Sequence, residues 1–293
     1  MKTSNKLLIG LLGFIGIGIL LFILMGRFSM TSFATEKVKG NGEVLENYRT
    51  VPAFNGVKIG RGMQMMLSKG ENSVGLKGES NIIEMIETTV ENEVLSIRWK
   101  SGTSVEKTQP IEIKIAMPGL EYLSVSSSAV VETTDDFAGE DAHIYASSGS
   151  TVKLQGLTTE SLEMDLSSSS TMRFTQGVAV ANNASIQLSS GSQLNFTDFT
   201  AEQLDTDMSS SSQLSLSGSA RSLTVDGSSG SEFKGAAFSV QNASFKGSSS
   251  SSFEVEVSDA LTASLSSGST VRYRGAAQVN KNLSSGSSVE KID

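Results

Sequence analysis

A short serine-rich block recurs through the chain, and this repeat limits the fold more than any other feature. The block reads Ser-Ser-Gly/Ser-Ser, and each copy begins 18 to 22 residues after the previous one. Copies begin at Ser147, Ser167, Ser189, Ser209, Ser228, Ser248, Ser266 and Ser284, and a shorter version stands at 126–128. A sustained repeat of this length is typical of a solenoid, in which similar units stack on one another.

Apolar and polar residues alternate on both sides of each block. In one repeat, Leu162, Met164 and Leu166 precede the block, and Met172 and Phe174 follow it. A period of two is typical of a β-strand with one buried face. Gly tolerates positive φ and Ser hydrogen-bonds to nearby backbone, so the block itself is suited to a tight corner. Each repeat is therefore predicted to contain a strand, a corner, a second strand and a variable loop.

Stacking places equivalent residues of successive repeats in columns. One predicted interior column contains Ile144, Met164, Ile186, Thr206, Val225, Phe245 and Ala263. The second contains Val152, Met172, Leu194, Leu214, Phe233, Phe253, Val271 and Val289. We predict an all-β fold, a right-handed single-stranded parallel β-helix with coils of about 20 residues, in which each strand pairs with its copy in the next coil. The hand follows from the general preference of parallel β crossovers.

The two ends of the repeat region depart from this pattern. Residues 54–117 are less regular, with strands predicted at 57–59, 63–67, 94–99 and 111–115 and a single helical turn at 82–86. We expect them to form the first coils of the same solenoid. At the other end, Lys281 and Lys291 replace apolar residues of the columns. Because charge at an exposed sheet edge prevents aggregation, residues 279–293 are predicted to be the terminal coil and cap.

An apolar segment near the N-terminus predicts export. Residues 7–25 contain no charged or strongly polar side chain, and Lys2 and Lys6 precede them. About 20 apolar residues in a helix span a bilayer, and flanking lysines favour a cytoplasmic N-terminus. We predict an N-terminal transmembrane helix that anchors the chain in the cell envelope with its C-terminal domain exported. The alternative is a signal peptide cleaved near 32–34, which would give a secreted or periplasmic protein.

The predicted organisation has three parts. Residues 1–27 form the anchor or signal segment, and 28–50 form a polar linker. Residues 51–293 form the β-helical domain, with irregular first coils at 51–122 and the serine-rich repeats at 123–293.

Composition excludes several function classes. The chain has no Cys and a single His, which rules out Cys-ligated zinc, thiol nucleophiles and multi-His metal sites. Its net charge of −8 argues against binding to nucleic acid, which needs a basic surface. No cofactor site, metal site or catalytic residue is predicted.

Three sets of residues are candidate sites. His143, placed on the outward face by register, is expected to be a solvated surface residue. Asp165, Asp207 and Asp226 share one repeat position, with Asp207 and Asp226 in adjacent coils, and either form a solvated face or bind a cation. Thr151, Thr171 and Thr270 share a column with Gln193, Gln213 and Glu232, which interrupts the threonine ladder that binding to ice would need.

The opening of the domain resembles a known family. Four segments are similar to the head GIN domain family: the run 54–59 (Phe-Asn-Gly-Val-Lys-Ile), the short motifs at 81–83 and 91–92, and Met117-Pro118 before the first serine block. The resemblance covers about residue 50 to the C-terminus. It implies a right-handed β-helical protein of the bacterial cell envelope with an adhesin-like role, and it carries no catalytic residues onto this chain.

Two classes of function remain open at this stage. The first is a non-catalytic envelope protein, an adhesin-like binding or scaffold β-helix whose partner is a cell-surface or envelope glycan or protein. The second is a polysaccharide-active lyase or hydrolase. Short, even loops and sparse aromatic residues favour the non-enzyme.

Overall fold

The computed structural model describes residues 37–293, which fall into two compact units. In the smaller unit, β1 (Lys37–Lys39) pairs with β8 (Ser104–Glu106), and Lys37 Nζ lies 2.8 Å from Glu106 Oε2. The predicted transmembrane segment at 7–25 lies outside the described residues. Within 37–293, no helix has the length and apolar character needed to cross a membrane.

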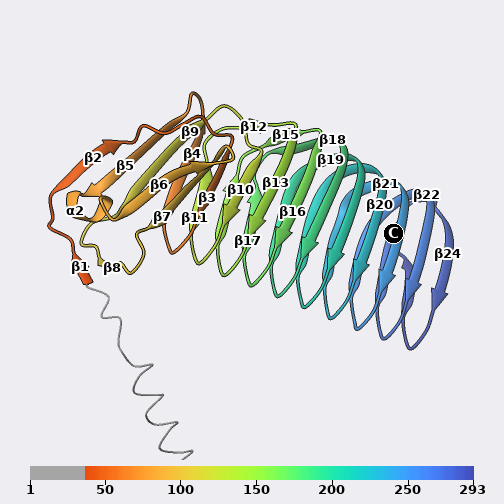
Figure 1. Ribbon diagram of the computed structural model, residues 1–293. Helices are drawn as coiled ribbons and strands as arrows, with labels where there is room; N and C mark the ends of the chain where they lie inside the picture. The colour runs from red at the N-terminus through yellow and green to blue at the C-terminus, as the bar shows by residue number, and fades with distance from the viewer. Residues whose placement is uncertain (1–36) are drawn as a thin grey trace, which may run out of the picture. The chain divides into compact units, whose positions relative to one another are not determined.

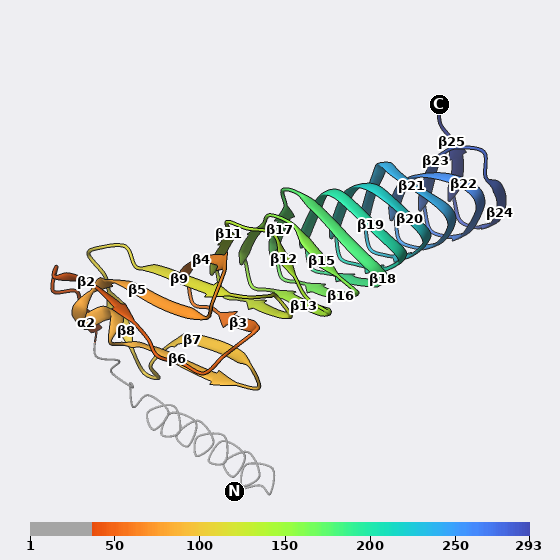
Figure 2. The same ribbon diagram turned by 90° about the horizontal axis from the view of Figure 1, so that it is seen from above.

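The larger unit is built almost entirely of β-strands. Its first part contains β2 (Val44–Tyr48), β3 (Gly56–Ile59), β4 (Gln64–Lys69), β5 (Ser73–Glu79), α2 (Ser80–Ile83), β6 (Ile86–Glu91), β7 (Val94–Trp99) and β9 (Glu112–Met117). The repeats contain β10 (Tyr122–Val125), β11 (Val130–Thr133), β12 (Phe137–Ala138), β13 (Asp141–Ala146), β14 (Thr151–Leu154), β15 (Leu157–Thr159), β16 (Ser161–Leu166), β17 (Thr171–Phe174), β18 (Gly177–Leu188), β19 (Gln193–Met208), β20 (Gln213–Gly227), β21 (Glu232–Gly247), β22 (Ser252–Leu265), β23 (Thr270–Arg274), β24 (Gln278–Leu283) and β25 (Ser288–Lys291). Figures 1 and 2 both show the repeat strands side by side as successive coils of a β-solenoid, which has about eight turns.

Parallel pairing between coils confirms the predicted columns. Met164 pairs with Ile186 and Ala263 pairs with Lys281, so the coil length varies from 22 to 18 residues. The second column is also in register, from Val152 and Met172 through to Val289. The described residues therefore form an all-β solenoid with the predicted interior. The right-handed winding stays a prediction.

Aromatic side chains pack against one another inside the repeats. Phe174 stacks on Phe196 with ring centroids 5.0 Å apart, and Phe199 packs against Phe196 at 4.9 Å. Further along the stack, the Phe253 ring occupies space beside Gly227, where an added Cβ would lie 2.5 Å from that ring. The glycine thus replaces a large core residue because its neighbour in the next coil already fills the site.

Two consecutive residues with positive φ form each serine corner. In block 189–192, φ is 52° at Ser190 and 70° at Gly191, and the Ser192 N–H donates to Ser189 O at 3.1 Å. The Gly191 N–H donates to Ser210 O of the next coil at 2.9 Å, so the corners are bonded to one another along the stack. Sequence reasoning assigned positive φ to glycine only, whereas serine occupies the first of the two positions in every block. The ladder of backbone bonds offsets a conformational cost of about 1 kcal/mol for each such serine.

The predicted variable loops are strands in the later coils, which corrects the sequence analysis. Strands β18 to β22 each contain between 12 and 16 residues and continue across the positions expected to be loops. They bend at register shifts, such as the one between Phe196 and Phe199. Gly218 is required at this bend, because its φ is 115° and an added Cβ would lie 2.2 Å from Phe199 O. Because these segments contain many polar residues, the alternation of apolar and polar residues did not predict this third sheet face of the solenoid.

The first part of the unit only partly continues the solenoid. As predicted, β3 and β4 pair in parallel with β10 and β11, and the four expected strands are present. The helical turn lies at Ser80–Ile83 and not at the predicted 82–86, and Ile86 begins β6. The expectation that the whole segment forms ordinary coils is wrong, because the pairs β2–β5, β5–β9 and β6–β7 are antiparallel. The chain reverses between β6 and β7 at Asn92 and Glu93, which both have positive φ. Strand β2 lies within the range predicted as a polar linker.

A buried carboxylate joins separate segments of this first part. Glu79, 1% exposed, accepts backbone N–H bonds from Gly42 at 2.9 Å, Thr108 at 2.8 Å and Gln109 at 3.2 Å. The Thr108 hydroxyl donates a fourth bond at 2.6 Å. These hydrogen bonds lower the pKa of Glu79 to about 2, and the bond from the Thr108 hydroxyl contributes most. Burial of the carboxylate acts in the opposite direction and raises the pKa.

The last coil carries lysines where earlier coils carry core residues. Lys281 pairs with Ala263 and Lys291 pairs with Tyr273, and both lysines are exposed. Strands β24 and β25 pair only with the preceding coil among the described residues. The position of the two lysines agrees with the predicted role of charge at a terminal coil.

Candidate binding groove

His143 lies on the outward face, as predicted from register. Its side chain is 44% exposed, and its Nδ1 atom lies 3.1 Å from Glu163 Oε2 in the next coil. The same carboxylate accepts a hydrogen bond from the Tyr145 hydroxyl at 3.3 Å. The residue therefore belongs to a surface cluster with two neighbours.

The aspartate positions form one outward column, as predicted. Asp165 pairs with Gln187, which pairs with Asp207, which pairs in turn with Asp226. A shallow cavity of about 290 Å³ lies over these four residues. Within residues 37–293, no group of three or more His, Asp or Glu side chains has the arrangement of a metal site. The next residue of the column is Lys246, which limits the negative charge.

The threonine positions also lie where the sequence places them. Thr151 and Thr171 pair with one another, and Gln193 follows Thr171 in the same column. Gln193, Gln213 and Glu232 interrupt this outer column after Thr171, so it is not a continuous hydroxyl ladder.

A groove that the sequence analysis missed runs across β18 to β22. It has a volume of about 520 Å³ and lies over five successive coils. Its floor is a column of small apolar residues in parallel register: Val180, Ala201, Ala220 and Val240. The short Ala side chains leave the space that larger residues occupy in the other interior columns.

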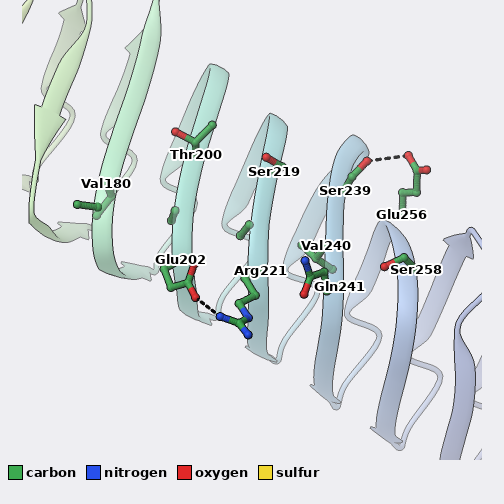
Figure 3. A pocket seen from close by; sticks show the side chains of 13 residues that line it. Val180, Thr200, Glu202, Ser219, Arg221, Ser239, Val240, Gln241, Glu256 and Ser258 are labelled. Atoms are coloured by element: carbon green, nitrogen blue, oxygen red, sulfur yellow. Dashed lines mark hydrogen bonds and ion pairs between the residues drawn. The ribbon is translucent and has the colours of Figure 1, made fainter.

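Polar side chains form the two rims of this groove. Thr200, Ser219 and Ser239 are in register along one rim. Figure 3 shows Glu202, Arg221 and Gln241 along the opposite side, each close to the bend that follows a floor residue. In the three coils of β19, β20 and β21, the rims therefore present hydroxyl groups on one side and longer hydrogen-bonding groups on the other.

Two hydrogen bonds hold charged side chains at the rims. Arg221 Nη1 donates to Glu202 Oε1 at 2.7 Å, and both side chains are more than half exposed. Ser239 Oγ donates to Glu256 Oε2 at 2.8 Å (Figure 3). The Glu202 carboxylate raises the pKa of Arg221 above its usual value, so the guanidinium stays charged. The groove thus carries one cation, Arg221, and two carboxylates, Glu202 and Glu256, which favours a polar ligand without strong negative charge.

The sequence contained a signal for this groove. Ala201 and Ala220 stand at positions where the alternating pattern predicts a core residue, yet they are much smaller than their neighbours in other columns. The signal was lost because these residues lie in the segment interpreted as a loop.

Comparison with known proteins places the chain in a family. The sequence profile described as "Putative auto-transporter adhesin, head GIN domain" matches residues 53–181 and 174–277. The chain belongs to the head GIN domain family. No curated protein shows significant sequence similarity to it.

Three solved structures are similar in fold to this head GIN protein. Two are described as putative adhesins, from Parabacteroides merdae ATCC 43184 and Parabacteroides distasonis ATCC 8503, with 20% and 19% identity and a TM-score of 0.68 each. The third, also from P. distasonis ATCC 8503, is described as a putative lipid binding protein, with 13% identity and a TM-score of 0.63. Each comparison covers 88% of this chain and 99–100% of the other. At these identities the similarity establishes the fold alone.

Proposed function

We propose that the chain is a non-catalytic binding protein of the cell envelope, and that it holds an extended glycan in the β18–β22 groove. The observation that carries this proposal is the return of a rim hydroxyl in three successive coils, at Thr200, Ser219 and Ser239, with coils about 4.8 Å apart. One unit of an extended glycan is close to this length, whereas an extended peptide advances roughly 3.3 Å per residue. A glycan can therefore present one unit to the hydroxyl of each of these three coils.

The exposed surface of the groove favours a glycan over an acyl chain. Val180 and Val240 on the floor are each only 4% exposed. Binding of an acyl chain depends on burial of apolar surface, and this floor offers little of it. The hydroxyl and carboxylate groups of the rims instead suit the many hydroxyls of a sugar polymer. The adhesin description of the family points in the same direction, toward recognition at a cell surface.

A blocked groove tests this function. Ser219 lies on the rim and Thr224 lies in the same strand, β20, outside the groove, and both are exposed. Binding of the full-length protein to a panel of soluble neutral and acidic polysaccharides would be measured in a detergent without a sugar headgroup. We expect Ser219→Trp to weaken binding at least tenfold and Thr224→Trp to leave it unchanged. Absence of binding by the parent protein, or equal loss in both variants, would refute the proposal.

We further propose that residues 7–25 anchor the protein in the membrane with the repeats exported. The supporting observation is the uncharged apolar run itself. Full-length protein should stay in the membrane pellet after a carbonate wash, and its N-terminus should precede Lys2. A mature N-terminus near Thr35 would show cleavage and make the secreted or periplasmic form correct.

A further inference from the structure

An aromatic cluster stands on the outward face of the first regular coils. Tyr122 in β10 and Tyr145 in β13 have ring centroids 5.6 Å apart with planes inclined at 44°. Tyr122 pairs in register with His143, which pairs with Glu163 of β16. All three aromatic rings are partly exposed, so their faces and edges are accessible to a ligand.

The same outward columns contain small polar or charged residues in the later coils. The column of His143 and Glu163 continues with Ser185, Asp205, Thr224, Ser244, Thr262 and Asn280. The column of Tyr145 continues with Asp165, Gln187, Asp207, Asp226, Lys246, Ser264 and Asn282. Stacking of coils therefore does not require an aromatic residue at these positions. Aromatic residues gathered on an exposed face are a common property of binding sites.

A cavity adjoins the cluster on its N-terminal side. It has a volume of about 320 Å³, and its lining includes Tyr122, Lys58, Ser96 and Arg98. Lys58 pairs with Ser124, which pairs with Tyr145, so the ammonium group lies on the same outward face two strands from that tyrosine. The cavity is within the size range of small-ligand sites, and Tyr122 belongs to both the cavity and the ring pair.

The polar groups of the cluster are held in fixed positions. Glu163 accepts from the Tyr145 hydroxyl at 3.3 Å through one oxygen and contacts His143 through the other. Burial, together with the negative charge of Glu163, raises the pKa of Tyr145, so its hydroxyl remains protonated and continues to donate. The carboxylate is therefore oriented before a ligand arrives, which lowers the entropic cost of binding.

We propose that Tyr122 and Tyr145 form a stacking platform for a single pyranose ring. The C–H face of a sugar ring carries partial positive charge and packs against the negative face of an aromatic ring. The hydroxyls at its edge need donors and acceptors close to that face, and the His143–Glu163 pair and Lys58 supply them. Val94 is the one aliphatic residue in the lining of the adjoining cavity, so the site lacks the apolar core of a protein interface. None of these residues lines the groove of Figure 3, and this site is independent of the function proposed for that groove.

Ligand-observed NMR with monosaccharides tests this site directly. Full-length protein would be mixed with methyl glycosides of hexoses, N-acetylhexosamines and hexuronic acids, and saturation transfer to each sugar would be recorded. We expect at least one pyranoside to receive saturation at the protons of one ring face, with a dissociation constant in the millimolar range, as expected for one weakly held sugar. Tyr122→Ala should weaken this binding at least tenfold, whereas Tyr122→Phe, which keeps the ring, should retain it.

Tyr48→Ala provides a matched control, because Tyr48 is 71% exposed and lies in β2, away from the platform. It should leave the saturation transfer unchanged. The proposal is overturned if no pyranoside in the panel receives saturation, if the signal survives Tyr122→Ala, or if Tyr48→Ala removes it equally. Because the groove is assayed with polymers and blocked by Ser219→Trp, which should not affect this signal, failure of one proposal is distinguishable from failure of the other.

Discussion

The last serine of every four-residue block before the final one is buried. Two of these serines predict opposite effects of the same substitution. Ser192 and Ser231 hold equivalent positions, and both are fully buried. The Ser192 hydroxyl donates to Leu166 O of the preceding coil at 2.9 Å. The Ser231 hydroxyl has no hydrogen-bond partner. Replacement by alanine therefore removes a hydrogen bond at one position and an unpaired polar group at the other.

The sizes of the two effects follow from the contacts. In Ser192→Ala, Leu166 O keeps its bond from the Ser189 N–H at 2.9 Å, so only one neutral hydrogen bond is lost. We expect the free energy of unfolding to fall by about 1 kcal/mol. In Ser231→Ala, removal of an unpaired buried hydroxyl relieves a desolvation cost of about 1–3 kcal/mol. The second variant should thus be as stable as the parent or more stable.

Equilibrium unfolding of full-length protein in urea measures both variants. The comparison uses the transition midpoint, with an unchanged slope as a check that the unfolding process is the same. Ser192→Ala should lower the midpoint, and Ser231→Ala should leave it unchanged or raise it. Equal decreases in the two variants would show that the assigned bonding of the corner serines does not determine their contribution to stability.

Three further predictions test the register, the Glu79 contacts and the absence of catalysis. Leu194→Asp places a charge at a fully buried position and should unfold or aggregate the protein. Asp165→Asn, on the outward face, should change stability by under about 0.5 kcal/mol. Equal shifts in melting temperature for the two variants would contradict the assigned register. The pKa of Glu79 falls from 4.5 to about 2 on folding, so its stabilising effect is present above pH 4.5 and is lost as pH falls toward 2. Melting temperatures measured between pH 7 and 2.5 should show this loss in the parent and a weaker pH dependence in Glu79→Gln. Identical pH profiles for the two proteins would refute the stabilising role of the Glu79 carboxylate. Asp207 and Asp226 are adjacent carboxylates in their column and are therefore the pair to test for catalysis. We expect no polysaccharide turnover by the parent protein, with or without Ca²⁺. Turnover by the parent that is lost in the Asp207→Asn, Asp226→Asn double variant would support an enzyme instead.

The interior of the solenoid was predictable because packing constrains it strongly. Alternating residues such as Met172 and Leu194 must face inward, and a fixed period brings them into register. The antiparallel strands near the N-terminus were not predictable in this way. Strand β5 reads Ser-Val-Gly-Leu-Lys-Gly-Glu, and its alternation is equally compatible with parallel or antiparallel pairing. Pairing direction depends on distant neighbours that a local pattern does not contain.

The candidate binding sites were harder to predict for a related physical reason. The groove depends on Ala201 and Ala220, whose small size matters only once the third face places them in one column. The tyrosine platform was closer to the sequence analysis, which placed His143 on the outward face. Its composition became clear only when pairing brought Tyr122 beside His143 and Tyr145, because the coil before 123 falls outside the regular repeat.

Outer positions of a solenoid carry functional information because the stack does not constrain them. An inward residue such as Ile186 must match its neighbours in volume, so its identity reports packing. An outward residue meets solvent and can be any polar residue without loss of stability, as the sequence Asp165, Gln187, Asp207 shows. An outward aromatic such as Tyr145 gains little from the stack and exposes apolar surface to water. An exposed aromatic residue at such a position is therefore better explained by binding of a ligand than by folding. For the platform, the decisive result is a Tyr122→Ala variant that keeps the fold and loses sugar binding.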